Sequence, residues 1–116
     1  MIKRRHRFHG LGSLRGVYRR GQTVRSSIIS LRYQINTGRD CYRAAVIVSK
    51  KVNKLAVRRN RIRRRVYEII RLNEQKLRPD CEFIVTVFSD QIEAWSAARL
   101  AKEIKSLLKR AGLFER

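Results

Sequence analysis

Two short runs of β-branched and aromatic side chains, separated by a long segment with helical periodicity, constrain the fold more than any other feature of this sequence. The first run lies in a strand predicted over residues 42–49, and because it is apolar on both faces we expect a central strand. The second run predicts a buried strand over residues 82–88. Between them, the apolar spacing predicts a helix over residues 55–77, ended by Pro79.

Three further segments complete the predicted order of elements. A short helix over residues 13–20 stops at Gly21, and the alternation of apolar residues predicts a strand over 27–35. The last segment, 94–113, is an amphipathic helix. Its predicted core side consists of Ala94, Ala97, Ala101, Ile104 and Leu108.

The resulting order, α-β-β-α-β-α, predicts the α+β fold class, as one α-β sandwich domain spanning residues 1–116. We expect a central mixed sheet of three or four strands with helices packed on it. Residues 1–9 carry four Lys or Arg side chains and few apolar ones, which predicts a mobile basic arm.

The charge balance indicates the kind of partner. The chain has 29 Lys and Arg residues against 9 Asp and Glu residues, for a net charge of +20 and a pI near 11.5. Residues 1–67 hold 20 of the bases and a single acid, whereas residues 68–116 hold nine bases and eight acids. Such a local excess predicts a polyanion-binding surface and argues against a stand-alone small-molecule enzyme. No apolar run predicts a membrane span or a signal segment, so we expect an intracellular protein.

The excess is densest on the predicted central helix. Six of the eight residues from Arg58 to Arg65 are arginines, and no acid stands four residues away to pair with them before Glu68. A solvated charged face is the ordinary interpretation of a charge run. Here the missing acids and the match between the guanidinium fork and phosphate favour contact with a nucleic acid.

Tyrosines near these bases favour RNA over duplex DNA. Tyr18, Tyr33 and Tyr42 lie on the first helix and the first two strands, where unpaired bases could stack on them. Each tyrosine taken alone is more typical of a place in the core or at its boundary, and only the group beside so many bases favours RNA. No helix-turn-helix pair, zinc finger or zipper pattern is present.

The cysteines do not suggest a metal site. Cys41 and Cys81 have no CxxC partner and no zinc-ligand spacing with His6 or His9, so we expect two reduced thiols at strand ends. A disulfide is the alternative if those strand ends are adjacent. No paired carboxylates or Cys/His and Ser/His constellations predict catalytic residues or a metal site in the protein.

One stretch of sequence resembles a known family. Ser49-Lys50-Lys51-Val52 followed by Ala56-Val57-Arg58-Arg59-Asn60-Arg61-Ile62-Arg63-Arg64 is similar to the signature of the bacterial ribonuclease P protein component. The segment from Tyr18 to Arg25 resembles the family's short helix, its glycine stop and the start of its first strand. The sequence departs from the family pattern at Asn53, where glycine is frequent, and at Leu14, where an aromatic residue is usual.

The resemblance implies a subunit that binds a catalytic RNA, expected at 1:1, and assists removal of the 5′ leader from precursor tRNA in the bacterial cytoplasm. It implies that the RNA, with Mg²⁺ bound mainly by the RNA, performs the hydrolysis. The residues implied to contact the catalytic RNA are Lys50, Lys51, Lys54, Arg58, Arg59, Asn60, Arg61, Arg63, Arg64 and Arg65. Those implied to hold the leader between the first helix and the sheet are Leu14, Tyr18, Arg32, Tyr33, Val46 and Val48.

The resemblance also implies a left-handed β-α-β crossover, although the right-handed form is the general rule. Two alternatives fit the size and charge of the chain. A structural ribosomal protein would have a similar composition, and a nucleoid protein would bind duplex DNA as tightly as folded RNA.

Overall fold

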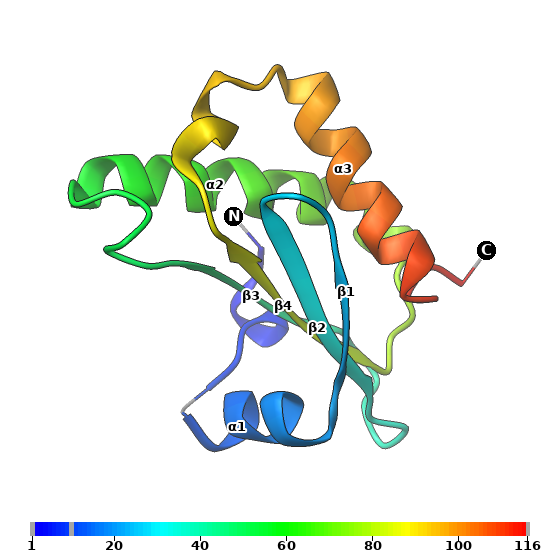
Figure 1. The fold of residues 1–116 in the computed structure, drawn as a ribbon. Coiled ribbons are helices and arrows are strands. Elements are labelled where there is room, and N and C mark those ends of the chain that lie inside the picture. The colour runs from blue at the N-terminus through cyan, green and yellow to red at the C-terminus, as the bar shows by residue number, and fades with distance from the viewer. Residues whose placement is uncertain (1, 10, 116) are drawn as a thin grey trace.

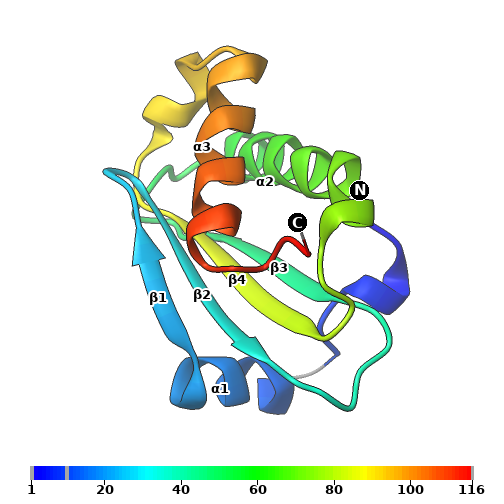
Figure 2. The ribbon, with the colours of Figure 1, turned by 90° about the vertical axis from the view of Figure 1, so that its right-hand side faces the viewer.

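The computed structural model describes residues 2–9 and 11–115. The chain forms a four-stranded sheet with helices on both faces (Figures 1 and 2). In chain order the elements are the 3₁₀ turn η1 (Arg4–His6), α1 (Leu11–Arg20), β1 (Gln22–Arg25), β2 (Ile29–Ile35), β3 (Arg43–Val48), α2 (Ala56–Leu72), η2 (Glu74–Lys76), β4 (Cys81–Val87), η3 (Asp90–Ala94) and α3 (Ala97–Arg110). The predicted mixed α+β class is confirmed.

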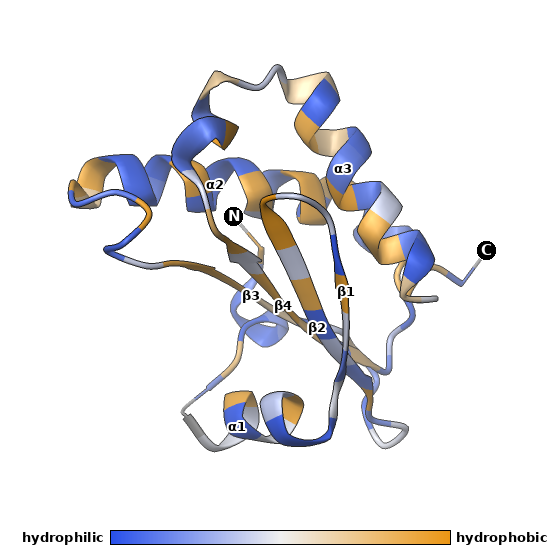
Figure 3. Ribbon diagram, viewed as in Figure 1, coloured by the Kyte–Doolittle hydropathy of each residue, from blue (hydrophilic) through white to orange (hydrophobic). Residues whose placement is uncertain are grey.

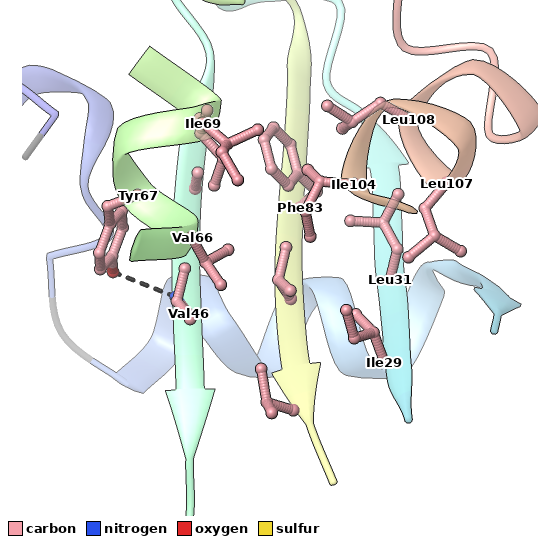
Figure 4. Packing of buried hydrophobic residues seen from close by; sticks show 14 of the residues in the cluster. Ile29, Leu31, Val46, Val66, Tyr67, Ile69, Phe83, Ile104, Leu107 and Leu108 are labelled. Carbon is pink, nitrogen blue, oxygen red and sulfur yellow. Dashed lines mark hydrogen bonds between the residues drawn. The ribbon is translucent and has the colours of Figure 1, made fainter. Parts of the chain in front are cut away.

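The sheet order is β1-β2-β4-β3, so the last strand in the sequence lies between two earlier ones. β4 pairs antiparallel with β2 and parallel with β3. Helices α2 and α3 cover one face and α1 covers part of the other (Figures 1 and 2). Because α2 lies on the face toward the viewer in Figure 4 while β3 and β4 both run downward, the β3–α2–β4 crossover is left-handed.

Alternation along each strand separates the two faces. Ile29 and Leu31 of β2 are buried beneath the helices (Figure 4). Phe83 and Val85 of β4 are buried on the same face. Helix α2 contributes Ile62, Val66, Ile69 and Ile70 to this core, and α3 contributes Leu100, Ile104, Leu107 and Leu108. In Figure 3, hydrophobic and hydrophilic residues alternate along β2 and recur in turn along α3.

The predicted central strand is wrong in position, because β3 lies at the edge of the sheet and β4 is central. One face of β3 is buried beneath α2, the other face is half-buried, and the edge of the strand is protected. Tyr67 of α2 accepts a hydrogen bond from the Val46 amide at 3.1 Å, and Arg7 forms an isolated bridge to Ala44. A side chain and a short segment therefore replace the neighbouring strand.

The segment predicted as a mobile basic arm makes specific contacts. Ile2 is buried, and the ring of His6 stacks on Tyr42 with centroids 4.0 Å apart. His6 Nδ1 also lies 2.9 Å from the carbonyl oxygen of Tyr42. The expectation of a free arm missed these contacts because its two buried side chains are spaced among exposed bases.

Several predicted boundaries shift. The helix expected over residues 55–77 ends at Leu72, where Asn73 turns its side chain back to donate to the Ile69 carbonyl at 2.8 Å. The final helix begins at Ala97, capped by Ser96, which leaves Ala94 and Ala97 exposed rather than in the core. β1 is a separate strand that pairs with β2, whereas the family resemblance implies only the start of the first strand at these residues. Within the described residues, none of the helices is both long and apolar enough to cross a membrane.

Candidate nucleic-acid interface

The loop after β3 and the first turns of α2 present most of the bases singled out in the sequence. The buried side of α2 is fixed by Ile62 and Val66, so the arginines around them point along or away from the protein surface. Asn53 orders the loop: its Oδ1 accepts from the Leu55 amide at 2.9 Å and its Nδ2 donates to Asp90 at 3.1 Å. The start of α2 is therefore tied to η3.

An acid missed by the sequence argument lies beside two of the arginines. Glu93 of η3 is 3.3 Å from Arg58 and 3.9 Å from Arg61. The expectation that no acid pairs with this run is wrong, because Glu93 reaches it through the fold rather than along the helix. The longer pair is weak, since the Arg61 side chain is 62% exposed.

Two other arginines bind main-chain carbonyls of the protein itself. Arg65 donates to the carbonyl oxygens of Ile92 at 2.7 Å and Trp95 at 2.6 Å. Arg59 donates at 2.9 Å to the carbonyls of Asn53 and Lys54. These contacts hold η3 and the loop against α2, so Arg65 has a structural role in this state.

The remaining bases face solvent. Lys50, Lys51, Lys54 and Arg64 are exposed, and their side chains make no hydrogen bond or ion pair with the residues the structure describes. Arg63 is hydrogen-bonded to the side chain of Asn60. The structure therefore divides the predicted RNA contacts into solvent-facing bases, paired bases and the structural Arg65.

The opposite, α1-facing side of the sheet contains the other predicted site. Arg32 lies on this side and donates to the carbonyl oxygens of Tyr18 at 2.5 Å and Val17 at 3.4 Å, and to Thr23 Oγ1 at 2.8 Å. It thereby satisfies carbonyls at the end of α1. Gly21 is required there, because a Cβ would lie 2.4 Å from the Val17 carbonyl oxygen.

Three of the predicted cleft residues lie on the wrong face for a site shared with α1. Val46 and Val48 are buried in the core beneath α2, and Tyr33 alternates with Arg32, so it faces away from α1. A strand's period of two explains the error, since neighbouring residues were assigned to one face. Tyr42 is also in the core, 3% exposed.

The residues that do face α1 across the sheet have the opposite parity. Ala45 and Ile47 of β3 and Thr86 of β4 are half-buried there. Phe88, directly after β4, is 50% exposed, and the Arg25 guanidinium lies 5.0 Å from its ring centroid. On α1 itself Tyr18 is 46% exposed and Leu14 is half-buried. Strand alternation together with the strand pairing identifies this set.

A buried ion pair closes one end of the α1-facing side. Glu82 of β4 accepts from Gln34 at 2.8 Å and from Arg43 Nε at 2.7 Å, and Arg43 also reaches Ser13 of α1 at 3.3 Å. Burial on its own raises the pKa of the Glu82 carboxyl. The hydrogen bonds from Gln34 and Arg43 and the charge of Arg43 outweigh burial and hold that pKa below its usual range.

The thiols and acids do not assemble a reactive or metal-binding centre in the described part of the chain. Cys41 and Cys81 are both free, and burial raises the pKa of the Cys81 thiol to about 12. No group of three or more His, Cys, Asp or Glu side chains among residues 2–9 and 11–115 could hold a metal ion. Two acids lie near the bases: Asp90 accepts a hydrogen bond from Asn53, and Glu93 is paired with Arg58. Because both carboxylates already have protein partners, they are poorly suited to bind Mg²⁺ by themselves.

Comparison with known proteins gives a consistent result. The sequence model of the family described as Ribonuclease P matches residues 2–112. The ribonuclease P protein component of Caldanaerobacter subterraneus is 36% identical over 99 residues, covering 85% of this chain and 83% of its own. That of Clostridium kluyveri is 32% identical over 102 residues, covering 87% and 89%.

Solved structures share the fold at lower identity. An RNase P protein from Staphylococcus aureus, a mutant with defective mRNA degradation activity, superposes with a TM-score of 0.84 at 22% identity, covering 95% of this chain and 91% of its own. The RNase P protein from Thermotoga maritima superposes with a TM-score of 0.80 at 23% identity, covering 90% and 96%.

Proposed function

The chain belongs to the ribonuclease P protein component family, and from this premise we propose that it binds ribonuclease P RNA and the 5′ leader of precursor tRNA. In this role it is the protein subunit of an endoribonuclease complex involved in tRNA processing. It assists the Mg²⁺-dependent cut that produces the mature 5′ end. We expect one protein per RNA in the bacterial cytoplasm.

The observation that carries the proposal is the group of solvent-facing bases at the end of β3 and along α2. The side chains of Lys50, Lys51, Lys54 and Arg64 have no partner among the described residues and can bind phosphates without breaking an internal contact. Arg61 can exchange its long contact with Glu93 for a phosphate at little cost, because the pair is exposed. These five bases form the primary RNA contact.

The paired arginines support this surface from behind. Arg65 fixes η3 against α2, and η3 carries Glu93, which orients Arg58. Arg59 holds the loop that presents Lys50 and Lys51. Phosphate binding by a preorganised set of side chains loses less conformational entropy than binding by a mobile set.

The leader contact is proposed for the α1-facing side of the sheet. Tyr18 and Phe88 are exposed aromatic side chains suited to stacking on unpaired bases, and Arg25 beside Phe88 suits an adjacent phosphate. Leu14 of α1, with Ala45 and Ile47, adds apolar surface. Arg32 acts by holding the end of α1 in place.

The chemical step is proposed to belong to the RNA and its Mg²⁺. Glu82, on the α1-facing side, and Glu93, beside α2, are each bound to arginine. The protein's contribution is charge neutralisation, which lets a folded RNA hold its phosphates and its Mg²⁺ more closely.

Reconstitution tests the proposal. Purified protein is added to a bacterial ribonuclease P RNA at low Mg²⁺, and cleavage of precursor tRNA is followed. We expect stimulation by the wild type and a tenfold or greater loss of RNA affinity for Lys51→Gln/Arg64→Gln, from about two lost phosphate contacts. Lys51→Arg/Arg64→Lys is the matched control, which retains both charges. Absence of stimulation at every protein ratio would contradict the proposal.

Leader recognition is tested separately with Tyr18→Ala and Phe88→Ala. Loss of one stacking contact is expected to weaken binding of substrates with a leader by about 1–3 kcal/mol. Affinity for mature tRNA should not change. An equal loss for both substrates would exclude these side chains as leader contacts.

A further inference from the structure

Helix α3 and the C-terminal segment enclose a second basic surface away from the start of α2. A hollow of about 1030 Å³ lies between α3, η2 and residues 114–115. Its apolar lining includes Ala98, Ala101 and Phe114. Its rim carries five bases, Lys76, Lys102, Lys105, Lys109 and Arg110, and one acid, Glu115.

Charge counted along the sequence conceals this surface. Residues 68–116 hold nine bases and eight acids and are nearly neutral. In the fold, however, six of these acids contact groups outside α3. The pairs are Glu68–Arg71, Glu74–Tyr42, Asp80–Arg78, Glu82–Arg43, Asp90–Asn53 and Glu93–Arg58.

Helix α3 is therefore left with uncompensated charge. Lys102, Lys105 and Lys109 recur at helical spacing along one exposed side, and none forms an ion pair with a described residue. Of the two acids not contacted elsewhere, Glu103 lies on α3 and Glu115 on the rim of the hollow. The excess remains positive.

We propose that this hollow, the α3 groove, is a second RNA-binding surface that holds a strand of the same catalytic RNA. The lysines suit consecutive phosphates, and the alanines with Phe114 offer a surface for a base or ribose. The proposal rests on the proposed function for the identity of the polyanion. RNA is favoured over an acidic protein because the chain belongs to the ribonuclease P protein family.

The position of the α3 groove gives the proposal a geometric consequence. Figure 1 shows the first turn of α2 at the left of the molecule and the C-terminal half of α3 at the right, and Figure 2 shows α3 beside the C-terminal segment. The principal extents of the molecule are 37 × 30 × 24 Å. RNA bound at both places would contact two sides of the protein.

Salt dependence of RNA binding tests the inference. The variant Lys102→Gln/Lys105→Gln/Lys109→Gln removes three charges, and Gln has nearly the helix propensity of Lys. The slope of log K against log salt is negative, and the loss of three phosphate contacts should make it less steep by about 2. Binding should weaken about a hundredfold at 0.1 M salt. The Lys→Arg triple variant retains the charge and should behave as the wild type.

Directed cleavage locates the RNA independently. An iron chelate attached at Ser106→Cys, in a Cys41→Ser background, should cut the catalytic RNA within reach of the groove. Attachment at Gln91→Cys, exposed on η3 beside the start of α2, should give a different pattern. Normal binding and slope for the Gln variant, with no cuts from residue 106, would overturn the inference. If the wild type binds and stimulates the RNA in those experiments, the proposed function stands and only the second surface fails.

Discussion

The buried carboxylate of Glu82 provides the sharpest test of how the α1-facing side of the sheet is held. Its side chain is 2% exposed and is bound to Arg43, with Arg39 3.8 Å away. The change Glu82→Gln retains the size of the side chain and one acceptor, but leaves the Arg43 guanidinium, 16% exposed, without its counter-charge. Removing one partner of a buried ion pair costs about 3–5 kcal/mol.

The expected shift can be expressed as a melting temperature. Unfolding entropies of about 2.1 cal/mol/K per residue give about 0.24 kcal/mol/K for 116 residues. A loss of 3 kcal/mol therefore lowers Tm by about 12 °C. Thermal and urea unfolding of the free protein at pH 7 measure the effect. The matched control is Glu68→Gln, whose exposed pair with Arg71 should leave Tm nearly unchanged.

The pH dependence separates charge from packing. The pKa of Glu82 is lower in the folded than in the unfolded protein, so its ionisation stabilises the fold above the unfolded value of about 4.3. That stabilisation is lost as the pH falls through the lower, folded-state pKa. Wild type and Glu82→Gln should therefore converge in stability as the pH falls below about 4.3 and through the lower, folded-state pKa of Glu82. A difference that stays constant with pH would refute the reasoning.

Two further changes test other contacts by urea unfolding. Tyr67→Phe removes the acceptor for the Val46 amide on the edge strand and should cost about 1–3 kcal/mol, whereas Tyr33→Phe, which loses an exposed bond to Gln22, should cost less. Equal losses would mean that the amide finds water instead. Gly21→Ala places a Cβ 2.4 Å and 2.6 Å from two backbone oxygens and should cost about 1–3 kcal/mol. Gly38→Ala, whose Cβ meets only the Asn36 side chain at an ordinary contact distance of 3.8 Å, should be nearly neutral. A stable Gly21→Ala protein would show that the end of α1 can move.

Periodicity predicted most of the fold because it depends on the local sequence. The apolar stripe of α2 and the alternation on β2 are both present, and the family resemblance supplied the hand of the crossover. Sheet order could not be read from the same signals. A run such as that of β3, apolar on both faces, occurs both at the centre of a sheet and at an edge that Tyr67 and Arg7 protect.

The candidate site was harder to predict because its electrostatics depend on contacts distant in sequence. Glu93 reaches Arg58 across 35 residues, and Arg65 binds carbonyls of η3. The sequence could identify the basic helix, but not which arginines face solvent. Alternation on β3 separates Val46 and Val48 from Ala45 and Ile47. Which of the two sets faces α1 follows only from the pairing of Arg32 with Ile84 and of Ile84 with Ala45, which the sequence did not predict.

The place of β4 between β2 and β3 also governs the order in which the protein can form. Strands β2 and β3 follow one another in the chain, yet each has its partner in β4, some 40–60 residues further on. A ribosome-bound chain that ends before residue 81 thus carries the arginines of α2 but neither the middle of the sheet nor Glu93. Such contacts between distant residues form slowly, and they form together. A nascent chain consequently contains the arginines of α2 before the scaffold that orients them, and the basic surface proposed to bind RNA forms only after β4 and η3 have been synthesised.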